Sequence, residues 1–151
     1  MADFQLAQIN IAQAKDNMES EVMRGFVERL DEINALAEKS EGFVWRLQDD
    51  SGNAAEIQVF DDPLLLINMS VWQDIESLKT YVYRSLHVDL LRDRDAWFDK
   101  TAKAHQALWW IPAGHIPTEA EGVERLQHLQ DHGPSATAFT FARPQPQPFT
   151  Q

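Results

Sequence analysis

The chain has 151 residues, a formal net charge of −11 and no cysteine, which suits one globular domain and excludes disulfides, thiol nucleophiles and cysteine-ligated zinc. The negative charge disfavours binding to nucleic acid or to an anionic membrane. Without a basic, apolar leader or an apolar stretch long enough to span a bilayer, we expect a cytoplasmic protein with no membrane partner.

The first part of the chain predicts a strand and then a helix. Residues 4–11 alternate between two faces, as a strand does. Residues 18–39 place apolar side chains at steps of three and four, which predicts an amphipathic helix. Asp16 or Asn17 is the expected N-cap of this helix, and Gly42 its left-handed stop.

The middle of the chain predicts two or three further strands and a second helix. Residues 43–47 alternate again, and a turn at 49–53 precedes a short strand at 57–60. A mainly apolar strand follows at 64–72. Asp74 is the expected N-cap of a helical region that continues, with a break, to about residue 103.

The last part predicts a strand, a helix and a final strand. Residues 107–111 are a tryptophan-rich strand, and Thr118 with Glu121 forms a capping-box pair for a helix that ends near Gly133. A last strand is expected at 137–141. We expect one domain over residues 1–143 and a flexible proline- and glutamine-rich tail over 144–151.

This order of elements defines the expected fold class. It is β-α-β-β-α-β with an appended C-terminal α-β, the plan of an α+β ferredoxin-like domain with an antiparallel sheet and both principal helices on one face. The opposite face must also be covered, and a chain of 151 residues has little left to cover it. The expected partner is a second copy, in a homodimer formed through the sheet faces.

Side-chain parity separates two faces of the sheet. One is uniformly apolar on the first three strands, and we expect the helices to cover it: Ala7, Ile9, Ile11, Phe43, Trp45, Leu47, Leu65, Ile67, Met69 and Val71. The other mixes apolar and polar residues, including Leu6, Gln8, Asn10, Arg46, Asn68, Ser70 and Trp72. The mixed face is either a lined small-molecule pocket or simply a half-exposed sheet face.

Residues 81–98 carry the densest group of reactive side chains. On a helix, Tyr83, Arg84, His87 and Arg94 fall within an arc of about 100°. Arginine binds carboxylates in a bidentate manner and histidine transfers protons near neutral pH, so His87, Arg84 and Arg94 are the candidate catalytic residues. The alternative is a solvated ion-pair lattice with the nearby aspartates. The candidate substrate-binding residues are Asn68, Trp72, Tyr83, Arg46, Trp110 and Asn10.

Other residue patterns favour no further chemistry. His128 and His132 are four residues apart on a helix, but no third ligand is suitably spaced, so we expect surface histidines and no metal. His115 is either a loop hydrogen-bonding residue or part of a pocket rim. The sequence contains no glycine-rich phosphate loop, nucleophile elbow or zinc-protease motif.

Several blocks of the sequence together resemble domain-of-unknown-function family 3291, over nearly the whole chain. They are residues 34–38, the Gly42–Leu47 block, Arg84 to His87, Arg94 with Trp97-Phe98, Trp109 to His115, and Ala138 to Phe141. The resemblance implies a dimeric α/β barrel, with a pocket between sheet and helices. The wider superfamily includes cofactor-independent antibiotic-biosynthesis monooxygenases, haem-binding enzymes and isomerases. Those monooxygenases use an Asn, a Trp and an Arg or His on electron-rich aromatic substrates, and Asn68, Trp72 and His87 are chemically compatible with such a set.

Three functional hypotheses follow. The first is a cofactor-independent monooxygenase or isomerase acting on an anionic or aromatic small molecule, with His87 as the base and Arg84 and Arg94 holding an anionic oxygen. The second is a haem-binding protein with His87 as the axial ligand. The third is a non-catalytic dimeric binding or interaction module.

Overall fold

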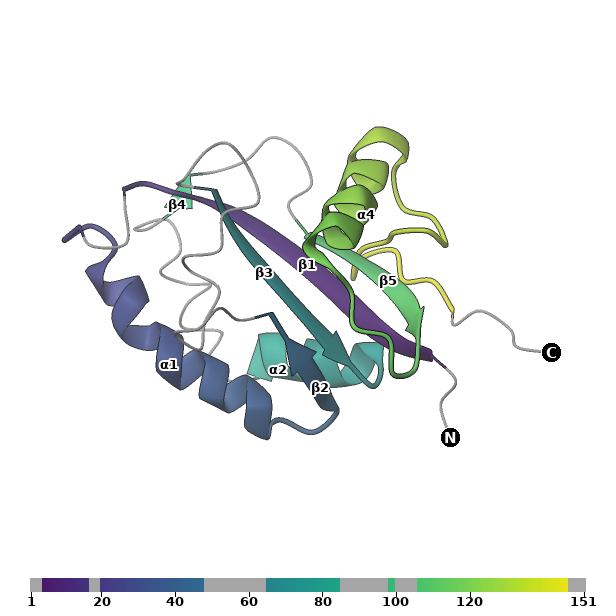
Figure 1. Ribbon diagram of the computed structural model, residues 1–151, viewed down its shortest axis with the longest axis horizontal. Helices are drawn as coiled ribbons and strands as arrows, with labels where there is room; N and C mark the ends of the chain where they lie inside the picture. The colour runs from purple at the N-terminus through teal and green to yellow at the C-terminus, as the bar shows by residue number, and fades with distance from the viewer. Residues whose placement is uncertain (1–3, 17–19, 48–64, 85–97, 100–105, 147–151) are drawn as a thin grey trace.

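The sheet is built around its first strand (Figure 1). The computed structural model describes residues 4–16, 20–47, 65–84, 98–99 and 106–146. The elements, in chain order, are β1 (Phe4–Ala14), α1 (Arg24–Lys39), β2 (Phe43–Arg46), β3 (Leu65–Trp72), α2 (Ile75–Arg84), β4 (Phe98–Asp99), β5 (Gln106–Pro112) and α4 (Glu119–His132).

The strand order is that of a ferredoxin-like domain. β1 pairs antiparallel with β3 on one side and with β5 on the other, and β2 pairs antiparallel with β3. The order β2-β3-β1-β5 confirms the predicted α+β class. The two-residue β4 pairs with the last two residues of β1, beyond the end of β5. The sequence placed these two residues in a helical region that continues to about residue 103, and this prediction is wrong at Phe98 and Asp99 because their backbone pairs with β1.

The uniformly apolar face lies under α4, and not under the first two helices as the sequence suggested. Leu126 and Leu129 of α4 join one core cluster with the apolar face of β1, β3 and β5. Gly122 allows this close approach, since a Cβ there would lie 3.0 Å from atoms of both Ile9 and Met69. The appended helix therefore covers the β1 and β5 part of the apolar face, which the sequence assigned to the first two helices (Figure 1).

The helices α1 and α2 both pack on the mixed face. Ala37 of α1 and Leu78 and Val82 of α2 form a second core cluster with Leu6, Trp72 and Leu108 of the sheet. The prediction that these two helices share one face is confirmed, but the face is the opposite one.

An irregularity in β2 moves one predicted residue to the other face. Phe43 is aligned with Trp72 while Trp45 is aligned with Val71, so the register shifts between the two residues. A bulge of this kind breaks the two-residue alternation. Phe43 consequently packs with the mixed-face cluster and Trp45 with the apolar one, although the sequence placed them on the same face.

The ends of the helices agree with the sequence at some positions and differ at others. Asp74 caps α2 by accepting a hydrogen bond from the Ser77 backbone N–H, and Gly42 has the expected positive φ of 85°. The predicted N-cap of α1 is wrong: α1 begins only at Arg24, after a turn, and its N-cap Met23 makes no side-chain capping bond.

The segment after α4 contains no regular strand. Residues 137–141 were predicted as one, but only isolated bridges occur, between Leu108 and Phe139 and between Thr140 and Arg143. The buried Phe139 nevertheless joins the mixed-face cluster, so this segment covers the β5 edge of that face. The turn and strand expected at 49–53 and 57–60 lie outside the described residues. Among the helices that the structure describes, none is long and apolar enough to cross a membrane.

Candidate functional site

A buried polar network lies in the middle of the mixed face. Gln8 of β1 and Ser70 of β3 are 4% and 7% exposed, and they are paired across the two strands. Gln8 Nε2 donates to Ser70 Oγ at 2.9 Å and to Asn68 Oδ1 at 2.7 Å. Trp72 Nε1 donates to the same Ser70 oxygen at 2.9 Å. The network is consistent with the general rule that buried polar groups find hydrogen-bond partners.

One end of this network is closed by aromatic and aliphatic side chains. Trp72 is fully buried, with Phe43 edge-on at 5.5 Å and Tyr81 stacked at 5.2 Å between ring centroids. Leu6, Leu108 and Phe139 belong to the same buried cluster. Because Trp72 is fully buried, a ligand cannot contact its indole directly. The indole influences the site through its hydrogen bond to Ser70.

The other end of the network is open. Asn68 is exposed and is paired in register with the half-buried Asn10, which is in turn paired with Gln106 of β5. The mixed face thus changes along its strands from a dry apolar end to an accessible end lined by carboxamides. Such a gradient, with a few convergent polar groups, is typical of small-molecule sites.

A cation and a phenol stand beside the network. Arg46 is aligned with Ser70 across β2 and β3, and its Nη2 lies 2.8 Å from Glu38 Oε1 of α1. Tyr81 of α2 donates its hydroxyl proton to the Ile33 carbonyl oxygen at 3.2 Å. Burial raises the pKa of Tyr81 to about 12, and the opposing effect of Arg46 places that positive charge in the neighbourhood of the phenol.

The structure brings together some of the predicted site residues. Asn68, Trp72 and Arg46 lie around Ser70, and Asn10 lies at the open end. Trp110 is on the same face but away from the network, because its Nε1 donates to the Gln145 carbonyl oxygen at 2.9 Å.

The predicted catalytic residues are not placed by the structure. Tyr83 and Arg84 form the last two positions of α2, and their side chains lie outside the description. His87 and Arg94 lie outside the described residues altogether. The assignment of His87, Arg84 and Arg94 therefore stays a prediction, as does the haem alternative that depends on His87.

Sequence reasoning named Gln8 and Ser70 as polar residues of a lined face but not as site residues, and it missed Tyr81. Gln8 and Ser70 are recognisable by parity, since both break an otherwise apolar row. Tyr81 follows the buried Leu78 by three positions, which on a helix places both on one side.

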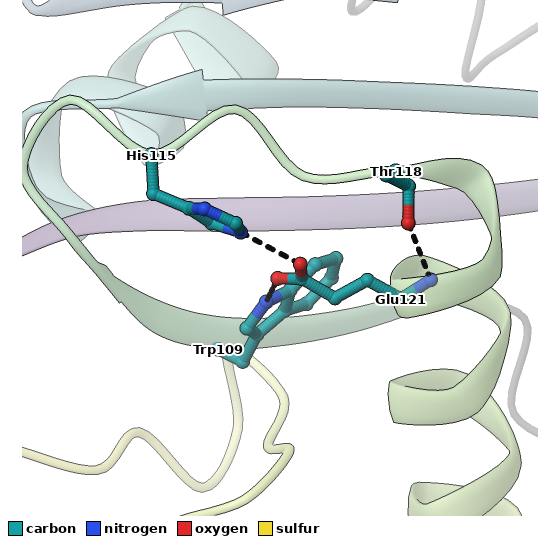
Figure 2. Close-up of polar contacts among 4 residues, drawn as sticks. All are labelled: Trp109, His115, Thr118 and Glu121. Atoms are coloured by element: carbon teal, nitrogen blue, oxygen red, sulfur yellow. Dashed lines mark hydrogen bonds and ion pairs between the residues drawn. The ribbon is translucent and has the colours of Figure 1, made fainter.

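A second polar cluster fastens the start of α4 to the apolar face (Figure 2). Thr118 Oγ1 accepts the Glu121 N–H, as the capping-box prediction requires. The Glu121 carboxylate binds elsewhere: Oε2 accepts from the buried Trp109 Nε1 at 2.9 Å, and Oε1 lies 2.7 Å from His115 Nε2. His115 is therefore a loop residue that holds the helix start in place.

The structure adds no metal site. The rings of His128 and His132 lie 4.5 Å apart on α4. Within the described ranges, no group of three or more histidine, aspartate or glutamate side chains is arranged to hold a metal ion.

Comparisons with known proteins give a family but no characterised relative. The comparison with curated proteins finds no match. Similar solved structures include NE2512, a protein of unknown function from Nitrosomonas europaea (TM-score 0.48, 12% identity, 77% of this chain and 97% of that chain). Others are PA3566 from Pseudomonas aeruginosa (0.48, 13%, 75% and 95%) and SnoaB, a cofactor-independent oxygenase from Streptomyces nogalater (0.45, 15%, 78% and 100%). Over residues 5–151 the sequence matches the family described as Domain of unknown function (DUF3291), and the chain belongs to that family.

Proposed function

We propose that the mixed face, under α1 and α2, binds an anionic or aromatic small molecule and that the protein acts on it as a cofactor-independent monooxygenase or as an isomerase. The observation that carries this proposal is the Gln8–Ser70–Asn68 network, in which Gln8 and Ser70 are buried and Asn68 is exposed, beside the apolar cluster of the mixed face. Because the network reaches the exposed carboxamide of Asn68, it offers a ligand hydrogen-bonding groups beside an apolar surface.

The two reaction types share their first step. A base, His87 in our proposal, removes a proton from a phenol or enol, and the neighbouring cations stabilise the resulting anion. In an isomerase the base then delivers the proton to a carbon atom of this anion, which gives the keto tautomer. In a monooxygenase O2 adds to the ring carbon, and the hydroperoxide then loses water. One oxygen atom becomes a quinone carbonyl, and the other leaves as water with the hydrogens of the original O–H and C–H bonds.

We also expect a partner copy, because the apolar face is not fully covered within one chain. The α4 helix contacts β1 and β5, whereas Trp45 and Leu47 at the β2 edge of the apolar face remain only partly buried. We propose a homodimer in which a second copy covers this remaining part. Sedimentation measurements test the dimer, and a monomer at all accessible concentrations contradicts it.

The enzymatic proposal is tested with a panel of polycyclic phenols and enols. Oxygen consumption and product mass identify oxygenation, whereas a changed product without oxygen consumption identifies isomerisation. We expect His87→Ala to lower turnover at least a hundredfold, within the usual range for a general base. His132→Ala, exposed on α4, is the matched control.

Three outcomes would redirect the proposal. A His87→Ala variant with full turnover removes the base assignment. A Soret band that develops on adding haemin, and that is lost in His87→Ala, favours the haem alternative. Unchanged function in the His87 and arginine variants favours a non-catalytic binding module.

A further inference from the structure

The neighbours of Ser70 already use two of the three hydrogen bonds that its hydroxyl can make. A serine hydroxyl can accept two hydrogen bonds and donate one. Ser70 Oγ accepts one bond from Gln8 Nε2 and one from Trp72 Nε1, both at 2.9 Å. Its proton has no acceptor among the residues that the structure describes. Ser70 is therefore left as a hydrogen-bond donor.

Asn68, like Ser70, is left with a hydrogen-bond donor. Its Oδ1 accepts from Gln8 Nε2 at 2.7 Å, which leaves the side-chain NH2 group as the available part of the carboxamide. Asn68 and Ser70 are two residues apart on β3, so both side chains point to the mixed face. Gln8 donates both bonds through its single Nε2. It therefore occupies an acceptor on Asn68 and on Ser70 and leaves their donors available.

The charged group next to these donors is Arg46, which is ion-paired with Glu38 of α1. Arg46 is the cross-strand neighbour of Ser70, and cross-strand neighbours have Cβ atoms about 5 Å apart. Its side chain is 11% exposed, and its partner Glu38 is 50% exposed. An exposed carboxylate is held less firmly than a buried one, so a ligand anion can share or replace Glu38 at the guanidinium.

We infer that the mixed face holds an anion-selective subsite, in which the Ser70 hydroxyl donates to an anionic ligand oxygen beside Arg46 and Gln8 is the positioning residue. The inference rests on the proposed function and specifies its ligand: a phenolate, enolate or carboxylate is bound in preference to the neutral compound. Two donors and one cation aimed at a developing oxyanion also favour its formation from a bound phenol.

The probes are 4-nitrophenol, at a pH where it is fully ionised, and 4-nitroanisole, which has the same ring and no ionisable proton. We expect the full-length protein to bind the phenolate about tenfold or more tightly than the anisole, the range of one hydrogen bond to a charged group. A second readout is the phenol absorbance titration, in which bound 4-nitrophenol ionises at a lower pH than free 4-nitrophenol.

Three variants separate the contributions. Ser70→Ala removes the donor, and we expect it to abolish most of the preference, while Ser70→Thr retains a hydroxyl and restores it. Gln8→Glu offers only acceptors, so Ser70 would donate to the new carboxylate, and the preference should disappear or reverse. Ser135→Ala, in the segment after α4, is the matched control, and thermal unfolding identifies any variant that fails to fold.

The outcomes distinguish a failure of this inference from a failure of the proposed function on which it rests. Equal binding of the two probes by the native protein overturns the anion subsite but leaves a small-molecule pocket. A preference that survives in Ser70→Ala overturns the role of Ser70. If neither probe binds at millimolar concentration, the subsite and the pocket are both overturned.

Discussion

The two faces of the sheet use the same chemical group in opposite ways. On the apolar face the fully buried Trp109 donates its indole N–H to the Glu121 carboxylate at the start of α4. On the mixed face the fully buried Trp72 donates its indole N–H to the neutral hydroxyl of Ser70. The two residues differ in their acceptor, and the acceptor decides what each contact does.

The Trp109 contact completes a local structure. With Trp109 and His115 at its two oxygens and Thr118 at its backbone N–H, Glu121 joins β5, the following loop and α4 (Figure 2). The Trp72 contact instead leaves Ser70 with a proton to donate. A satisfied charged cluster is typical of a structural fastening, whereas a network with donor capacity left over is typical of a binding site.

The largest expected loss of stability comes from breaking the charged contact between Trp109 and Glu121. Trp109→Phe removes the indole donor and part of the ring, and we expect unfolding free energy to fall by about 2–4 kcal/mol, because a partly buried carboxylate loses a donor. Trp72→Phe removes the same atoms from an equally buried position but loses only a neutral bond, with an expected loss of about 1–2 kcal/mol. Chemical denaturation of both variants measures the difference.

A double-mutant cycle sharpens this comparison. Combining Trp109→Phe with Glu121→Gln isolates the interaction between the indole and the carboxylate, for which we expect a coupling of about 1–2 kcal/mol. If the two tryptophan variants lose equal stability and the cycle shows no coupling, the distinction between a charged and a neutral acceptor is wrong.

A second effect involves only the mixed face. Burial raises the pKa of Tyr81 to about 12 from an ordinary value of 10.0, so the folded state favours the protonated phenol. The resulting stabilisation is fully present below pH 10 and is lost as pH rises through 12, with a total on the order of 2 kcal/mol. Denaturation measured across this range should show the decline.

Tyr81→Phe is the control for the alkaline effect, since it removes the titrating group and keeps the ring stacked on Trp72. Tyr83 is the only other tyrosine in the chain, so absorbance titration of Tyr83→Phe follows Tyr81 alone. Ionisation of Tyr81 near pH 10, or an unchanged alkaline decline in Tyr81→Phe, would contradict the assignment.

The smallest expected effects are at the two helix caps, one on each face. Thr118→Ala removes the α4 cap and Asp74→Ala the α2 cap, and each should cost about 1 kcal/mol. Hydrogen exchange should show faster opening of the first turn of α4 in the former and of α2 in the latter. Equal acceleration in both helices would mean that the two faces do not open independently.

Much of the fold could be predicted because its elements have strong local patterns. Asp74, Gly42 and Thr118 act through hydrogen bonds or backbone angles within a few residues of themselves, so sequence identifies them. The register shift between Phe43 and Trp45 could not be predicted, because an alternating pattern looks the same with or without a bulge. The site was predicted in part: Asn68, Trp72 and Arg46 follow from parity, whereas the Tyr81 contacts depend on how α2 packs.

The sequence alone determined the order of the longer helices and strands, the two-faced sheet and the family resemblance, because periodicity, caps and motifs are properties of neighbouring residues. The tertiary structure decided which helices cover which face and which acceptor each tryptophan reaches. Ser70 illustrates the division. Its position on the mixed face follows from counting along β3, but its role as a donor depends on Gln8, which reaches it from 62 residues away in the chain. Long-range hydrogen bonds of that kind leave no local pattern in the sequence.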